Sequence, residues 1–390
     1  MKNRKTSEII YYIALFLYMA LCLYLYINQL KYPVTGRFEA DTPVHVSMAV
    51  DDGFYYSLTA FVYLLLSFLP FSDLLIALFL SICTCLSVVM CVRLTKDVAE
   101  AYDLKVKEGY IYIFSFCANF VMGFYVRAFN VQHYIGYQNA NMWHNSTYIV
   151  MRLFALWCLI LYLDIYKDSK LNIKKLILFC AVLTLSTAVK PSFFTVFAPV
   201  MAIELLWDLF KKKKPFKDVF FFALTVVPSF AVLILQSLVL FGDDTGNGYA
   251  ISPFTALSQR GDHPKVTLVL SVLFPLLVFI THIKEAFKDR IYAFSLLVWL
   301  FGFIEVFFFL ETGTRTGDSN FFWGYSIALF VLFFESGILI LKDIFKKKIF
   351  EETAVLPKVY ITALCAIYLW HVISGIRYFV LLLEGLTYFV

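Results

Sequence analysis

A polar stretch after the first hydrophobic segment carries four carboxylates and a histidine. Glu39 and Asp41 come first, His45 follows, and Asp51 and Asp52 are adjacent. Carboxylates and imidazoles are side chains that move protons in catalysis or bind cations. We therefore interpret this stretch as a candidate site for chemistry at a membrane surface.

The individual acids also have simpler interpretations. Glu39 and Asp41 suit ordinary solvated loop positions, and Asp41 also suits the N-cap of a helix that begins at Pro43. Asp51 and Asp52 are candidates for a divalent cation such as Mg²⁺ or Mn²⁺. Adjacent side chains point apart on a helix, so a metal there needs another oxygen ligand from elsewhere.

Three cationic side chains are candidates for holding an anionic substrate. Arg315 and Glu311 share a polar turn with two glycines, which allow close backbone approach, and an arginine can bind phosphate in bidentate fashion. Lys190 stands between two apolar runs, and Arg127 ends another. The alternatives are an interfacial anchor for Lys190 and a polar turn in which Arg315 pairs with a neighbouring acid.

A third polar stretch contains Trp143, His144 and Asn145. This mixture of indole, imidazole and amide groups is typical of sugar-binding sites. It is equally consistent with an interfacial cap in which Trp143 lies at the level of the lipid headgroups.

The composition identifies the elements that must position these residues. The chain has 390 residues, of which 61% are hydrophobic and 19% aromatic, whereas soluble domains average roughly 45–50% apolar residues. Apolar runs recur from end to end, and about 20 such residues cross a bilayer. We therefore expect residues 1–390 to form a single all-α, polytopic transmembrane domain with no separate soluble domain.

The same survey excludes several classes of function. The net charge of +5 does not indicate nucleic-acid binding, because the basic residues lie in short loops rather than on one face. The chain has no Gly-rich phosphate loop and no dinucleotide fingerprint. All eight cysteines fall in apolar segments, without the spacing of metal ligands.

Hydropathy predicts about eleven transmembrane helices, with one further apolar stretch, 54–69, of ambiguous position. The expected spans are 8–28, 72–92, 110–129, 147–166, 174–189, 192–210, 219–241, 267–283, 291–310, 321–341 and 358–380. Between 174 and 210, Lys190 falls at the midpoint and is followed by a proline, which indicates a tight hairpin.

Basic residues decide the orientation and the position of 54–69. If this segment does not cross, 24 of the 33 Lys and Arg residues lie in loops on one side. The loops on the other side contain only Lys31, Arg37, Lys190, Arg260, Lys265 and Arg315. The positive-inside rule then predicts a plasma-membrane protein with a cytoplasmic N-terminus and an extracytoplasmic C-terminus. Residues 29–71 become the first extracytoplasmic loop, with 54–69 as an interfacial helix.

Charged residues within the predicted spans also need a partner or a cavity, because isolated charges in a bilayer are costly. Arg127, Arg152 and Glu305 lie near the predicted outer ends of their spans and point to a site there. Glu335 and His371 lie deeper, and we assign them no role.

The layout of the chain resembles the GT-C superfamily of membrane glycosyltransferases. The resemblance rests on the segment from Asp41 to His45 in the first outer loop, with support from 143–147, 190–193 and 311–324. It implies an extracytoplasmic site, a polyprenyl-phosphate-linked sugar donor and an acidic catalytic base in that loop. This chain has Glu39-Ala40-Asp41 where an Asp-x-Asp would stand, and it lacks the large soluble domain of several relatives.

The resulting hypothesis is inverting sugar transfer from a polyprenyl-phosphate donor to a glycan or lipid acceptor, in contact with membrane lipids and without nucleic acid. Asp41 is the expected base, Glu39 the second candidate and His45 the orienting partner. Arg315, Lys190 and Arg127 are expected to hold the phosphate. The expected acceptor or sugar contacts are Trp143, His144, Asn145 and Glu311. The alternatives are a glycan polymerase or ligase of the cell envelope, and a flippase or transporter of lipid-linked sugars.

Overall fold

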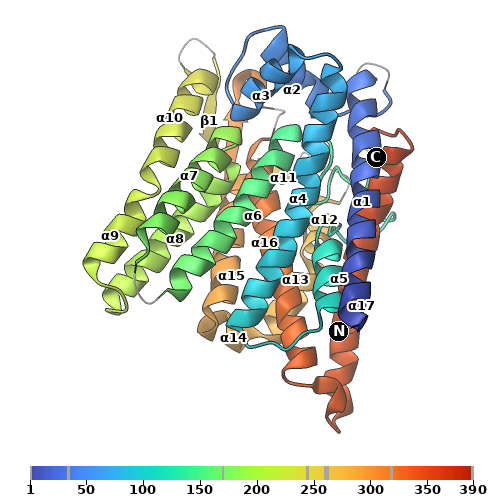
Figure 1. Cartoon of the computed structure of the whole chain (residues 1–390), viewed down its shortest axis with the longest axis vertical. Coiled ribbons are helices and arrows are strands. Elements are labelled where there is room, and N and C mark those ends of the chain that lie inside the picture. The colour runs from blue at the N-terminus through green and yellow to red at the C-terminus, as the bar shows by residue number, and fades with distance from the viewer. Residues whose placement is uncertain are drawn as a thin grey trace.

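The computed structural model describes residues 2–32, 36–168, 171–242, 246–258, 263–316 and 319–387, and these residues form a bundle of long helices (Figure 1). In this part of the chain, eight helical segments are long and apolar enough to cross a membrane. They are α1 (Lys2–Lys31), α4 (Ser72–Ala101), α6 (Ser146–Lys167), α8 (Ser192–Phe210), α9 (Phe216–Leu224) together with α10 (Val227–Phe241), α15 (Arg290–Phe308), α16 (Phe321–Phe345) and α17 (Val355–Leu383). The protein thus has the architecture of an α-helical, multi-pass membrane protein.

The expected count of eleven spans is not confirmed. The bent pair α12 (Pro264–Ser271) and α13 (Leu273–Thr281) would make a ninth span, with a bend of 60° between its halves. α7 (Ile173–Val189) has 17 residues, and α5 (Glu108–Ala118) has 11. The predicted span 110–129 is therefore wrong over its second half, because the helix ends at Ala118.

The chain between α5 and α6 has no helix, yet much of it is buried in the bundle, including Val121, Ala140 and Met142. Buried backbone groups without regular structure need other hydrogen-bond partners. The Asn141 amide supplies one, donating to the carbonyl oxygens of Ala118 at 3.1 Å and Val121 at 2.7 Å. This side chain thus closes the open carbonyl end of α5.

Further hydrogen bonds to this loop come from a side chain of the same segment and from α17. The Asn139 side-chain oxygen accepts from the Gly123 N–H at 2.9 Å. The His371 ring Nδ1 pairs with the Met122 carbonyl at 2.6 Å, and the Met122 N–H donates to the His371 carbonyl at 3.2 Å. His371, to which the sequence assigned no role, therefore joins α17 to this loop.

Two short helices and one small sheet cover the end of the bundle opposite the Lys-rich loops. α2 (Asp41–Val50) and α3 (Leu58–Ser67) lie across the top of the view in Figure 1. β1 (Gly248–Ile251) pairs antiparallel with β2 (Phe309–Thr312), Gly248 facing Thr312. A ten-residue helix such as α3 is about 15 Å long and cannot cross a bilayer. The expectation that 54–69 does not cross is thereby supported.

The remaining short elements connect the long helices. They are α11 (Thr255–Ser258), α14 (Ile283–Lys288), and the 3₁₀ turns η2 (Gly313–Arg315) and η3 (Ile349–Glu351). α16 lies at the centre, with 94% of its most apolar window buried. It packs closely on α15, where Gly302 leaves no room for a side chain, since an added Cβ would lie 2.9 Å from the Ala328 Cβ.

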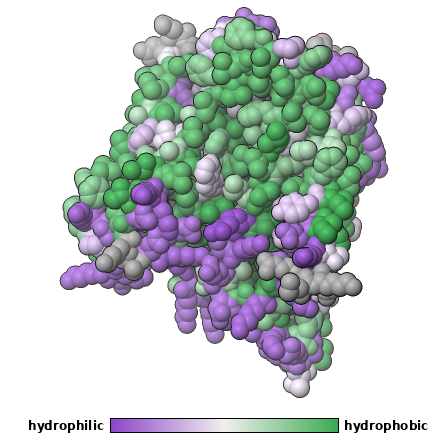
Figure 2. All heavy atoms as spheres, in the orientation of Figure 1, coloured by the Kyte–Doolittle hydropathy of each residue, from purple (hydrophilic) through white to green (hydrophobic). Residues whose placement is uncertain are grey.

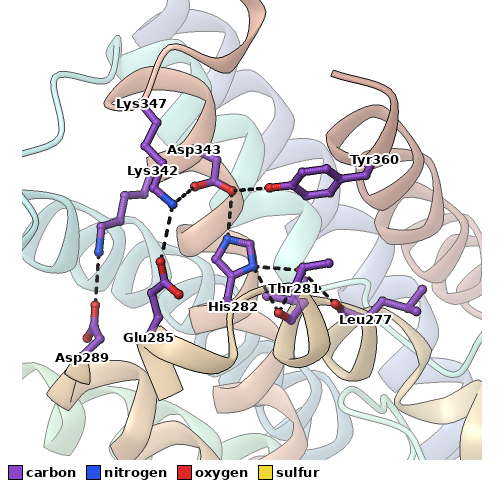
Figure 3. A network of polar contacts seen from close by, with 10 residues as sticks. Leu277, Thr281, His282, Glu285, Asp289, Lys342, Asp343, Lys347 and Tyr360 are labelled. Carbon is purple, nitrogen blue, oxygen red and sulfur yellow. Dashed lines mark hydrogen bonds and ion pairs between the residues drawn. The ribbon is translucent and has the colours of Figure 1, made fainter. Parts of the chain in front are cut away.

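Ion pairs join the loops at the other end, here called the Lys/Arg-rich end, which carries residues 211–214 and 346–348. Lys347 bonds Asp343 at 2.7 Å and Glu285 at 3.5 Å, and Asp343 also accepts from His282 at 2.8 Å (Figure 3). Lys346 donates to the Tyr102 carbonyl at 2.7 Å. Figure 2 shows hydrophilic residues gathered toward this lower end and hydrophobic residues over much of the face above it.

These contacts bring together three of the predicted inner segments, 93–109, 284–290 and 342–358, as the charge count predicts. The tips of α2 and α3 lie at the opposite end (Figure 1). Arg260, one of the basic residues counted on the other side, lies outside the described residues.

We predict that Gly375→Ala destabilises the protein because α17 touches the buried loop at this position. An added Cβ would lie only 1.7 Å from the Phe120 carbonyl oxygen, so helix or loop must move. The apparent Tm of the detergent-purified protein measures the effect. Gly109→Ala is the matched control, because its Cβ would meet nothing closer than 3.5 Å and alanine favours a helix by up to about 1 kcal/mol. A Tm for Gly375→Ala equal to that of the control would contradict the close approach.

Candidate active site

A cavity of about 470 Å³ opens beneath α2, between α7, α8, α10, α15 and α16. Its polar lining includes Asp41, His45, Asn145, Lys190 and Arg315. Its apolar lining comes mainly from α2, α10 and the start of α16: Val44, Met48, Leu233, Leu240, Phe241, Phe321 and Trp323. Residues from widely separated parts of the sequence thus share one pocket.

Asp41 is the first residue of α2 and is held from both its backbone and its side chain. Its N–H donates to the His144 carbonyl at 3.0 Å, and its Oδ2 accepts from the Asn145 amide at 2.7 Å. The predicted N-cap role is wrong, because the N-cap is Ala40 and no side chain caps this helix. The carboxylate instead belongs to the first turn of α2, at the positive end of the helix dipole.

Asn145 fixes this carboxylate because it is itself fixed as the N-cap of α6. Its Oδ1 accepts from the Tyr148 N–H at 2.9 Å and from the Thr147 hydroxyl at 2.8 Å, which leaves the amide nitrogen to face Asp41. The side-chain orientation follows from this capping geometry. Thr147 then extends the network, because it also accepts from Lys190 Nζ at 3.1 Å.

Lys190 lies at the turn between α7 and α8, which confirms the predicted hairpin. Its ammonium group lies 4.8 Å from the centroid of the Trp323 ring, a cation–π contact, while it donates to Thr147. Both contacts hold the ammonium group of this partly buried lysine at the cavity. Trp323 was not selected as a site residue from the sequence.

Arg315 also lines the cavity and belongs to the turn after β2. Its Nε lies 3.4 Å from Glu311, and its guanidinium group lies 5.6 Å from the Phe241 ring centroid. Glu311 is 4% exposed and is held by the Asn320 N–H at 3.1 Å. Gly313 provides the close approach expected from the sequence, with φ +76° and an added Cβ only 2.5 Å from the Gly246 carbonyl.

Glu305 is a further acid in the cavity. Its Oε1 accepts from the Thr195 hydroxyl at 2.8 Å, and Oε2 has no hydrogen-bond partner among the described residues. An added Cβ at Gly324 would lie 2.4 Å from Oε2, so glycine is needed where the carboxyl group packs on α16. The position of this acid within a predicted span had pointed to a site.

Several predicted site residues do not line the cavity. Trp143 is buried and donates to the Tyr18 hydroxyl at 2.7 Å, and His144 contributes its carbonyl oxygen to Asp41 rather than its ring to the pocket. Glu39 is partly buried beside the site. Arg127 lies exposed in a turn. Arg152, also predicted to lie within a span, donates to Asn119 at 2.8 Å inside the bundle.

The expected metal ligands are likewise elsewhere. Asp51 and Asp52 are exposed at the end of α2, and neither lines the cavity. Within the described part of the chain, no group of three or more His, Cys, Asp or Glu residues is placed to hold a metal ion.

His45 lies one turn after Asp41, and its Nδ1 pairs with the Ser146 hydroxyl at 3.1 Å. Burial, together with the nearby positive charge of Lys190, lowers the pKa of His45 to about 4, although Asp41 acts in the opposite direction. The ring is therefore neutral near pH 7, with one nitrogen able to accept a proton or a hydrogen bond.

A search against protein-family models found no match to this chain, and no curated protein matches its sequence. The chemistry of the cavity has therefore to be argued from its geometry. It holds one carboxylate fixed at a helix start, a neutral imidazole, two cations and an apolar wall.

We predict that His45→Gln makes the protein less sensitive to acid. Unfolded histidine titrates near pH 6.5 and folded His45 near 4, so between these values the unfolded chain binds the extra proton. The contribution of His45 to the free energy of unfolding is therefore lost as the pH falls through this window. The loss is about 1–2 kcal/mol after allowance for the partial exposure of the side chain. Tm measured in detergent at pH 7.5 and 5 tests this.

His133 and His144, whose pKa values burial also lowers to about 4, are present in both proteins and provide the common background. An equal fall in Tm for wild type and His45→Gln would show that His45 is not protected from protonation by the fold.

Proposed function

We propose that the protein is a membrane glycosyltransferase that moves a sugar from a polyprenyl-phosphate donor to a hydroxyl group of a glycan or lipid. The observation that carries the proposal is the cavity whose lining includes Asp41, Lys190 and Arg315, with Asp41 and Lys190 joined through Asn145 and Thr147. The charge count of the loops assigns this cavity to the extracytoplasmic side of the plasma membrane.

The lining of the cavity suits the parts of such a donor. Lys190 and Arg315 supply positive charge for a phosphate, and arginine can bind two phosphate oxygens at once. Leu233, Leu240 and Phe241 of α10 supply an apolar surface for the first units of a lipid chain. The neighbouring residues of α10, such as Leu235 and Leu238, are exposed and face the bilayer in this proposal. A lipid-borne substrate could then enter from the side.

The proposed reaction is a single inverting displacement. Asp41 accepts the proton of the acceptor hydroxyl as its oxygen forms a bond to the anomeric carbon of the sugar. The bond between that carbon and the phosphate oxygen breaks, and the electron pair leaves with the lipid phosphate. Lys190 and Arg315 stabilise the negative charge on this leaving group. Neutral His45 and the Asn145 amide orient the acceptor hydroxyl group.

We predict that Asp41→Asn lowers sugar transfer by roughly two to four orders of magnitude, the usual contribution of a general base. The folded state should survive, because asparagine can still accept from Asn145. The assay follows radiolabelled sugar from polyprenyl-phosphate donors into lipid or polymer fractions of membranes containing the full-length protein.

Glu39→Gln is the matched control, since Glu39 is a neighbouring acid that does not line the cavity. It should keep near-normal activity. Full activity of Asp41→Asn would exclude Asp41 as the base, and loss of activity in Glu39→Gln alone would move that role to Glu39.

We predict that Asp41→Cys and Arg315→Cys both react with a membrane-impermeant maleimide applied to intact cells. Both positions line one cavity, which the proposal places outside. Lys213→Cys, at the Lys/Arg-rich end, should react only after permeabilisation. The native cysteines among the described residues are buried or partly buried, so background labelling should be low. Labelling of Lys213→Cys in intact cells would reverse the orientation.

A further inference from the structure

A second cavity, of about 210 Å³, opens near the Lys/Arg-rich end, between α4, α6, α8, α15 and α16. The lining residues show that it lies near this end: Ala101 and Lys167 are the last residues of their helices, and Arg290 is the first residue of α15. Aromatic rings form much of its wall: Tyr162, Tyr166, Phe294, Phe330 and Phe334. It shares no lining residue with the proposed active site, so the inference below does not rest on the proposed function.

Glu335, on the central helix α16, lines this second cavity and is only 4% exposed. Its carboxyl group makes no hydrogen bond or ion pair with any described residue, and its Oε2 is fully buried. A buried carboxyl group without a partner is costly, and in a membrane protein such a group marks a site. Glu335 therefore needs a partner that the described part of the chain does not supply.

The two cations that line the cavity, Lys167 and Arg290, are already bound to acids. Arg290 forms two hydrogen bonds with Asp208, at 2.9 and 3.1 Å, and also bonds Glu204. Lys342 pairs with Asp289 at 3.3 Å, as Figure 3 shows.

Lys167 donates to the Asp97 carbonyl at 3.2 Å and to Glu100 at 3.4 Å. These pairings leave the negative charge of Glu335 uncompensated when the group is ionised.

We propose that the second cavity binds an organic ammonium ion with an apolar body, whose nitrogen donates to Glu335 and whose body packs on the aromatic wall. Aromatic faces and a carboxylate together are the surroundings that such cations favour. An anionic ligand would be repelled by ionised Glu335, and the two cations that line the cavity are already paired with acids. A neutral apolar ligand would leave the carboxyl group without a partner. The amine is either a soluble molecule or a lipid headgroup.

Labelling of Glu335 with dicyclohexylcarbodiimide tests this assignment on the full-length protein. The protonated acid adds across a C=N bond of the carbodiimide, and the O-acylisourea rearranges to a stable N-acylurea, so the whole reagent is added and nothing leaves. Mass spectrometry of the Glu335 peptide measures the yield. Hexylammonium should reduce it roughly tenfold at saturation, because the paired carboxylate does not react. Hexanol and hexanoate, which match its chain, should not.

A binding measurement supplies the second readout. Hexylammonium should raise the Tm of the wild type, and Glu335→Gln should weaken this binding about tenfold or more, because a charge-assisted hydrogen bond is lost. Protection by hexanol equal to that by hexylammonium would overturn the proposal, as would an unreactive Glu335. The proposal would also be overturned if hexylammonium protected Glu305, in the other cavity, equally from carbodiimide labelling. The protection would not then come from binding at Glu335.

The source of the amine is tested in lipid nanodiscs. If a lipid headgroup is the ligand, labelling of Glu335 falls when phosphatidylethanolamine replaces phosphatidylglycerol, and hexylammonium adds little. If the ligand is soluble, labelling is the same in both lipids and falls only with hexylammonium. Labelling that neither phosphatidylethanolamine nor hexylammonium reduces would exclude an ammonium ligand.

Discussion

The requirement that buried backbone groups find hydrogen-bond partners governs the centre of this protein. The chain between α5 and α6 passes through the bundle without helix or strand, so its N–H and C=O groups cannot bond to their own turns. Asn139, Asn141 and His371 take the place of that regular structure. They hold the loop in one path, and that path ends at Asn145. The amide that fixes Asp41 thus follows a segment held by buried polar contacts, and its orientation is set by the capping of α6.

A second consequence of membrane-like architecture is the separation of charged groups to the two ends of the bundle. At the Lys/Arg-rich end, cations and carboxylates pair across loops, as between Lys347, Asp343 and Glu285. At the other end they converge on the larger cavity. Glu305 and Glu335 are exceptions, since each lies within a long helix and each has an oxygen without a partner among the described residues. Both line cavities, consistent with the high cost of an isolated charge among apolar side chains.

Some residues of the candidate site could be selected from the sequence, and others could not. Asp41, His45, Lys190 and Arg315 were selected by residue type and by the charge of neighbouring loops, and the structure brings all four to one cavity. Trp143 and His144 were selected in the same way as Asn145, yet only Asn145 lines the cavity. Three consecutive residues in an irregular segment point in different directions, and no periodicity in the sequence says which one faces the pocket. Trp323 and Thr195 were not selected as site residues, because an aromatic residue and a threonine near the ends of apolar helices are ordinary.

The sequence by itself determined the helical membrane architecture, the grouping of loops at two ends and the hairpin at Lys190. These properties follow from local hydrophobicity and from the distribution of Lys and Arg, which each segment carries independently of its neighbours. Tertiary structure alone decided that the helix of the third predicted span stops at Ala118, that Asn145 bonds Asp41, and that Glu335 faces a cavity rather than a cation. These features depend on partners more than a hundred residues away or on the packing of several helices, and no local pattern specifies such partners.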